Sequence, residues 1–235
     1  MEKIIYLIWR DPRVDIETFG RKLRGELAVQ LRAIASVRSL RVNVADAAVA
    51  AGSGIKQTFL NPPLETVVQV WLDSAIAHLR QPVDDAIAAH AARHAAYLVT
   101  ESQPLRNLQH PPKSGERTEG FSQIALLRKP QRLSYAEWLD IWHNSHTRVA
   151  IETQSTFEYI QNVVIRPLTA GAPPLDAMVE ECFPVAALAD PLTFFDAVGN
   201  QAKFDANLKA MMDSVHRFID LATIDVVPTS QYCLY

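Results

Sequence analysis

Two stretches decide the fold: IIYLIWRDPRVDIETF at residues 4–19 and QIALLRKPQRLSYAEW at residues 123–138. They align without a gap at an offset of 119 residues. Each begins with a strand-like apolar run, continues through a basic residue and a proline-containing turn, and ends at a helix start. The candidate N-caps are Asp15 and Ser134, and Ser134 with Glu137 has capping-box spacing. The chain therefore contains one structural unit twice.

Both halves continue with the same order of predicted elements: helix, strand, loop, strand, helical segment and strand. In the first half we expect a helix to about Ala35, strands over 37–44 and 66–72, a helix over 82–95 and a strand near 97–100. In the second half we expect a helix over 135–151, strands over 157–166 and 177–185, helices after Pro191 and over 202–215, and a strand near 218–227. This order predicts an α+β protein made of two tandem ferredoxin-like βαββαβ repeats.

The segment 109–119 is rich in proline, lysine, serine, glycine and glutamate and lacks apolar periodicity, so we interpret it as a linker. The first repeat then spans residues 1–108 and the second spans residues 120–235. Each unit leaves one sheet face that needs cover. We therefore expect the two sheets to pack on each other into a barrel with the helices outside.

Composition and charge exclude several classes of protein. The net charge is −3, the basic residues are scattered, and no apolar run reaches the ~18 residues of a membrane span. We therefore expect neither a nucleic-acid partner nor a membrane partner. Two cysteines are too few for a disulfide scaffold and no secretory leader is recognised, which predicts a cytoplasmic protein. A homodimer is compatible with the sequence, although no surface feature demands one.

The second copy carries the motif LLRKPQRLSYAEWLDIWHNSHTRVA at residues 126–150. In it a strand, a basic turn and a serine cap precede aromatic residues and a histidine at intervals of four: Trp138, Trp142 and His146. This motif resembles that of the EthD-domain family, within the dimeric α+β barrel superfamily. A weaker likeness lies in the segment 213–220. The first copy keeps the frame without the signature, because the aligned residues are Phe19, Leu23 and Leu27.

The resemblance implies that one chain forms the barrel that single-repeat relatives build as a dimer. Relatives in the superfamily include lactone isomerases, dehydratases, decarboxylases, cofactor-free oxygenases and haem-binding proteins. Many of them act on aromatic compounds or polyketides, at sites between the sheet and the helices of one module. The resemblance thus implies a small-molecule site in the second copy and a structural first copy.

The helix expected over 135–151 places Trp138, Trp142, His146 and Val149 on one apolar face, which should meet the sheet. His146 then lies in a partly dry environment, where an imidazole can accept or donate a proton near neutral pH. The alternative is a structural histidine satisfied by one hydrogen bond. The resemblance favours catalysis, and Leu27 in the first copy agrees, because the fold does not require histidine there.

Other residues complete a candidate substrate site. Trp138 and Trp142 would form its wall, and His143 lies one turn before His146. Tyr159 is the candidate hydrogen-bond donor to substrate, with Asn162 on the opposite strand face as its alternative. The pattern leaves open which of these two faces the helices. Arg128, at the end of a strand, would receive a carboxylate or enolate oxygen, or else is an exposed arginine at a turn.

These features predict a cofactor-independent lyase acting on a small hydroxylated aromatic or polyketide-like compound, with His146 as general acid or base and Tyr159 beside it. An isomerase, a cofactor-free oxygenase and a non-enzymatic binding or accessory protein are the alternatives. The pairs His143/His146 and His90/His94 have helical metal-ligand spacing but no third ligand in a recognisable pattern. GxGxxG, P-loop and GxSxG motifs are absent, so we expect neither a metal nor a nucleotide cofactor.

Overall fold

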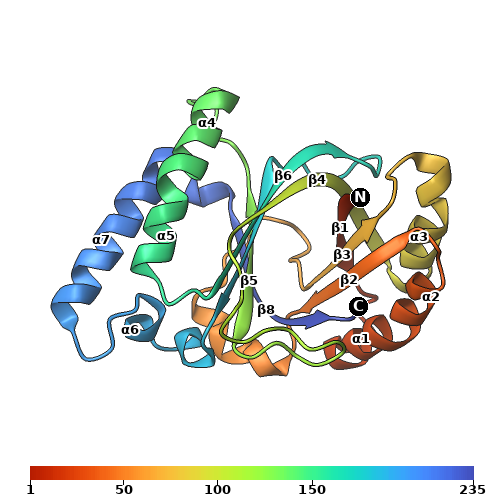
Figure 1. The fold of residues 1–235 in the computed structure, drawn as a ribbon, viewed down its shortest axis with the longest axis horizontal. Helices are drawn as coiled ribbons and strands as arrows, with labels where there is room; N and C mark the ends of the chain where they lie inside the picture. Colours follow the sequence, from red (N-terminus) through yellow and green to blue (C-terminus); the bar gives the residue numbers. More distant parts are fainter.

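The computed structural model describes residues 1–235 and contains one closed barrel of eight antiparallel strands (Figure 1). The first copy supplies β1 (Glu2–Trp9), β2 (Val37–Val44), β3 (Thr66–Leu72) and β4 (Arg93–Leu105). The second copy supplies β5 (Phe121–Leu127), β6 (Glu158–Pro167), β7 (Ala177–Phe183) and β8 (Asp225–Cys233). The order around the barrel is β1-β3-β2-β8-β5-β7-β6-β4, so the copies meet where β2 pairs with β8 and β4 with β6. The predicted α+β fold of two repeats in one barrel is confirmed.

Each copy covers the outside of its own half of the barrel with helices (Figure 1). The first copy uses α1 (Ile16–Lys22), η1 (Leu23–Leu27), α2 (Ala28–Arg32) and α3 (Ala77–His90). The second uses α4 (Tyr135–Ile141), η3 (Trp142–His146), α5 (Thr147–Thr153), α6 (Pro191–Phe194) and α7 (Gln201–Phe218). Short 3₁₀ turns are η2 (Ala47–Gly54), η4 (Val185–Leu188) and η5 (Leu221–Thr223). None of the helices has the length and apolar composition needed to cross a membrane.

The first long helix of each copy contains a π-helical turn at the same place, η1 in one and η3 in the other. In η3 the amide of Thr147 donates to the carbonyl of Trp142, five residues back. This wider turn contains one residue more than an α-helical turn, so the buried face shifts along the sequence. Ala150 is therefore buried where the regular pattern predicted Val149, which is only half-buried.

Two helices have bounds that differ from the sequence-based prediction, and the first of them, α3, also begins earlier, at Ala77 rather than residue 82. Helix α3 ends at His90 rather than residue 95, because Ala95 and Ala96 pair with β1 in strand β4. Helix α7 continues to Phe218, and β8 begins only at Asp225, so the strand predicted near 218–227 was wrong in its first half. Both segments are rich in alanine or apolar residues, whose local preference is overridden by strand pairing and packing.

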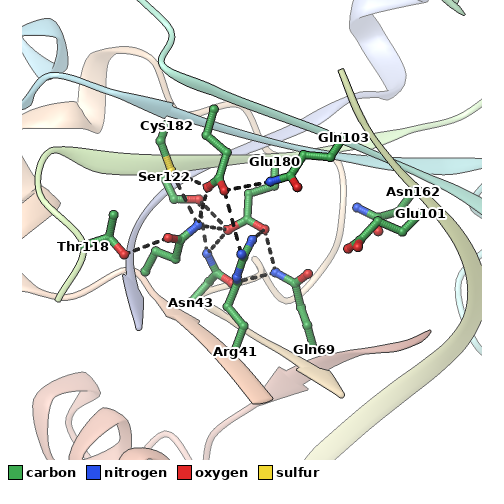
Figure 2. A network of polar contacts seen from close by, with 12 residues as sticks. Arg41, Asn43, Gln69, Glu101, Gln103, Thr118, Ser122, Asn162, Glu180 and Cys182 are labelled. Carbon is green, nitrogen blue, oxygen red and sulfur yellow. Dashed lines mark hydrogen bonds and ion pairs between the residues drawn. The ribbon is translucent and has the colours of Figure 1, made fainter. Parts of the chain in front are cut away.

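The centre of the barrel is filled by side chains. At one end a polar network surrounds Glu180 of β7, which accepts hydrogen bonds from five side chains (Figure 2): Arg41, Asn43, Gln69, Ser122 and Gln231. Burial opposes ionisation of Glu180, but the charges of Arg41 and Lys3 outweigh it and hold its pKa down at about 2. This network joins strands of both copies through one buried carboxylate.

The connection between the two copies runs along β8. The amide of Gly115 donates to the carbonyl of Cys233 at 2.8 Å, and that of Thr118 donates to Gln231 at 2.9 Å. The segment predicted as a linker, residues 109–119, lies within this connection between β4 and β5. It is thus attached to the end of the barrel by backbone hydrogen bonds.

Candidate functional site

A cavity of about 790 Å³ lies between the outer face of the second half-sheet and the helices that cover it. Its floor includes Gln123 and Ala125 of β5, Glu181 of β7 and Tyr159 of β6. Helices η3, α6 and α7 form its walls. Of its 29 lining residues 21 are hydrophobic, and none is lysine or arginine. The cavity is therefore suited to a largely apolar, uncharged ligand.

The first copy closes part of this cavity. Ser53 and Gly54 of η2 line it, as does Gln57, whose backbone pairs with that of Val226 in β8. A Cβ atom on Gly52 would lie 2.6 Å from Leu188 Cδ2, so η2 approaches η4 of the second copy closely because residue 52 is glycine. Besides forming half of the barrel, the first copy thus contributes residues to the wall of the cavity.

His146 enters the cavity from η3 and is only 7% exposed. Its Nδ1 lies 3.0 Å from the Ser214 hydroxyl, and its ring centroid is 4.5 Å from that of Phe218. Burial, helped by the positive charge of Arg217, lowers the pKa of His146 to about 4. The imidazole is therefore neutral at neutral pH. Because Ser214 holds Nδ1, Nε2 is the ring atom left to exchange a proton with a ligand.

Tyr159 faces the helices, which settles the question that the strand pattern left open. Its hydroxyl accepts a hydrogen bond from the indole N–H of Trp142 at 3.2 Å. Trp142 is fixed from the other side, since its carbonyl accepts from the hydroxyl of Thr147 at 2.8 Å. Burial, and then the nearby Glu181, raise the pKa of Tyr159, so the phenol keeps its proton. Tyr159 can thus donate a hydrogen bond into the cavity.

Glu181 is a cavity residue that the sequence analysis missed. It is 7% exposed, and its Oε1 is buried without a hydrogen-bond partner. In the strand register it lies between Tyr159 of β6 and Gln123 of β5. Burial raises the pKa of Glu181 to about 8, although Gln123 opposes this in part. Since strand residues alternate between faces, the adjacent Glu180 and Glu181 had to point to opposite sides of β7, and this pattern could have revealed Glu181.

Residues 130–222, which include η3, β6 and β7, match the family model of the EthD domain. The match lies within the second copy. No curated protein sequence matches the chain significantly. An anthrone oxidase-like protein of known structure shares the fold of the whole chain, with a TM-score of 0.60 at 9% identity over 99% of this chain and 92% of that one. A proposed monooxygenase from Fusobacterium nucleatum has a TM-score of 0.50 at 8% identity, over 100% of this chain and 92% of that one. Such low identities show the common fold alone.

The EthD motif residues are divided between the cavity and the core. His146 and Trp142 line the cavity, whereas Trp138 is fully buried behind it and donates its indole N–H to the Phe218 carbonyl at 3.0 Å. His143 is exposed and lies outside the cavity, with its ring centroid 4.8 Å from that of Trp142. The π turn thus directs one of the two histidines inward and leaves the other at the surface.

Two residues expected at the site of the EthD domain lie elsewhere. Arg128, at the end of β5, donates to the Thr223 carbonyl and to Asp225 Oδ2, and stacks on Phe59. Asn162 faces the barrel interior and donates to the Met178 carbonyl at 3.2 Å. Both side chains are on the opposite sheet face from the cavity, because their strand positions have the parity of Ile124 and Ile160 rather than that of Gln123 and Tyr159. No three histidine, cysteine or carboxylate side chains converge in a way that would hold a metal ion.

Proposed function

We propose that this protein is a cofactor-independent enzyme that moves a proton in an uncharged, hydroxylated aromatic or polyketide-like compound, with His146 as the base. The observation that carries the proposal is the cavity itself, in which a neutral imidazole, a phenol and a carboxyl group meet within an apolar space. Its volume is in the range of sites for drug-sized ligands, which is ~300–1,000 Å³.

The reaction class that this chemistry favours is a lyase reaction, and within it an elimination or a retro-aldol cleavage. Each needs a base for one proton and a hydrogen-bond donor for the oxygen on which charge develops. His146 supplies the first role from the wall, on η3, and Tyr159 supplies the second from the floor, on β6. Decarboxylation fits less well, because a substrate carboxylate would be buried in a cavity lined by no cationic side chain.

A cofactor-free oxygenation is the second candidate reaction, since it begins with the same removal of a proton. The similarity of fold to a protein described as anthrone oxidase-like adds a reason to test it. An isomerase would use the same base without releasing a fragment. The non-enzymatic alternative is a carrier that binds the same class of compound without changing it.

Mass spectrometry separates these possibilities. A panel of hydroxylated aromatic and polyketide-like compounds is incubated with the wild type, with His146→Gln and with His143→Gln, in air and under nitrogen. Loss of water or a small aldehyde in both atmospheres indicates a lyase, a new isomer of equal mass an isomerase, and gain of oxygen in air an oxygenase. We expect the product to disappear with His146→Gln and to persist with His143→Gln. Equal product from wild type and His146→Gln would remove His146 from the mechanism.

A further inference from the structure

Glu181 has no structural task that explains a carboxyl group at its position. Its neighbour Glu180 holds five donors in the barrel interior, whereas Oε1 of Glu181 has no partner and faces the cavity side of the sheet. No arginine or lysine lines the cavity to neutralise it. A buried carboxyl group in such a place is retained at a cost in stability, which a functional role would explain.

We propose that Glu181 is the proton donor of this site: it protonates a carbonyl or leaving hydroxyl oxygen of the substrate while His146 takes the proton from carbon. The inference rests on the proposed function and adds its second acid–base residue. It stands on geometry, since both side chains line one cavity, from β7 below and from η3 above.

The electrostatic environment divides the two roles. Burial raises the pKa of Glu181 to about 8 and lowers that of His146 to about 4. At about pH 6 the carboxyl group therefore still has its proton, whereas the imidazole has none. Two groups whose pKa values are pushed apart in this way form a natural acid and base. The other titratable group facing Glu181 is the neutral phenol of Tyr159, and the charge of Arg217 acts on His146 from α7.

For a cyclic ketone such as anthrone the step balances without any co-reactant. Nε2 of His146 takes a proton from the ring methylene carbon, and the C–H electron pair forms a carbon–carbon double bond. The carbonyl π bond breaks as its oxygen takes the proton of Glu181, which gives the enol. In an elimination the same acid protonates the hydroxyl group that leaves as water. With a ketone, the imidazolium N–H exchanges with solvent and the reverse proton transfers then restore both side chains. After an elimination, the imidazolium of His146 releases its proton to solvent and the carboxylate of Glu181 takes one from solvent, so protons and electrons balance in both cases.

Deuterium exchange at the methylene group of anthrone tests this assignment. The protein is incubated with anthrone in deuterated buffer under nitrogen, and deuterium uptake is followed by mass spectrometry. We expect Glu181→Gln, which keeps the shape but has no acidic proton, to slow exchange by about 100-fold or more, whereas the exposed Glu152→Gln has no effect. The wild-type rate should fall as the pH rises through about 8, and this fall should be missing in Glu181→Gln.

Infrared difference spectroscopy gives an independent readout. At about pH 6 the wild type minus Glu181→Gln spectrum should contain the carbonyl band of an un-ionised carboxylic acid, and the band should vanish as the pH passes about 8. Absence of the band, or an exchange rate unchanged in Glu181→Gln, overturns the role of Glu181 and leaves His146 as the base. A band without any wild-type exchange contradicts both Glu181 as donor and the proposed function on ketones.

Discussion

The two copies share one fold but differ above the half-sheet, where the second copy has a cavity and the first has a packed cluster of buried side chains. The offset of 119 residues matches Gln123, Ala125 and His146 with Ile4, Tyr6 and Leu27. In the strand register Glu181 pairs with Gln123 as Val70 pairs with Ile4, and Tyr159 pairs with Glu181 as Leu40 pairs with Val70. Four of the five first-copy counterparts are aliphatic, and the fifth is Tyr6. All five are fully buried in one core cluster: Ile4, Tyr6, Leu27, Leu40 and Val70.

The difference at residue 125 explains why the space is open. In the first copy the Tyr6 ring stands on the sheet and its hydroxyl donates to Asp84 of α3 at 2.8 Å. In the second copy Ala125 leaves that volume unfilled below η3 and α7. The π turn, by contrast, is present in both copies. It therefore belongs to the shared fold, and the polar residues of the second copy are the part specific to the site.

The largest expected effect comes from making the second copy resemble the first at the proposed base. His146→Leu, which copies Leu27, should lower turnover by about 10²–10⁴-fold, because no other cavity residue is a base that is free of protons at neutral pH. The matched reverse change, Leu27→His, should leave turnover unchanged. Steady-state rates on the substrate found in the product screen provide the measurement. Full activity in His146→Leu would contradict the assignment.

The second prediction concerns a substitution that creates a cavity in the first copy. Tyr6→Ala should lower the free energy of unfolding by about 3–5 kcal/mol, because it removes a fully buried aromatic side chain from a packed cluster and leaves Oδ1 of Asp84 without its donor. Ligand binding to the second copy should persist. Urea denaturation measures the loss, and a change below about 1 kcal/mol would show that the first half-sheet is not tightly covered.

The third prediction concerns Glu181→Val, which introduces the residue type of the first-copy counterpart, Val70. The folded state raises the pKa of Glu181 from 4.5 to about 8, so it binds a proton more tightly than the unfolded state does. The stability that Glu181 contributes is therefore fully present below about pH 4.5 and is lost as the pH rises to about 8, by up to ~1.4 kcal/mol per pH unit. Glu181→Val should lack this loss. Unfolding measured across this range should show the two curves diverging; parallel curves would mean that the carboxyl group is not desolvated.

The smallest effect is expected at the hydrogen bond between the wall and the floor. Tyr159→Phe leaves the buried indole N–H of Trp142 without an acceptor, at a cost of about 1–3 kcal/mol in unfolding free energy. In the first copy Leu23 and Leu40 hold the corresponding positions without a hydrogen bond. Adding Trp142→Leu to Tyr159→Phe should therefore cost less than the sum of the two single changes. Additive costs would show that this bond is not what links the two residues.

The sequence was sufficient for the architecture because the repeat and the strand and helix periodicities are local signals. It also led to His146, Trp142 and Tyr159, which line the cavity. It could not place Arg128, since which face of β5 a terminal residue joins depends on pairing with β7 and β8. Glu181 was missed because two adjacent glutamates look alike in a sequence, although one is ionised in the interior and the other is un-ionised beside the cavity.

The central claim is that the space above Ala125 is the ligand site, and filling it tests this most directly. Chrysophanol, a coloured and neutral tricyclic phenol, is titrated into the wild type, into Ala125→Tyr and into the control Ala136→Tyr on the exposed side of α4. We predict one bound molecule per wild-type chain, unchanged binding in Ala136→Tyr, and affinity weakened by about 100-fold or more in folded Ala125→Tyr. Binding to Ala125→Tyr that is as tight as to the wild type would contradict the claim.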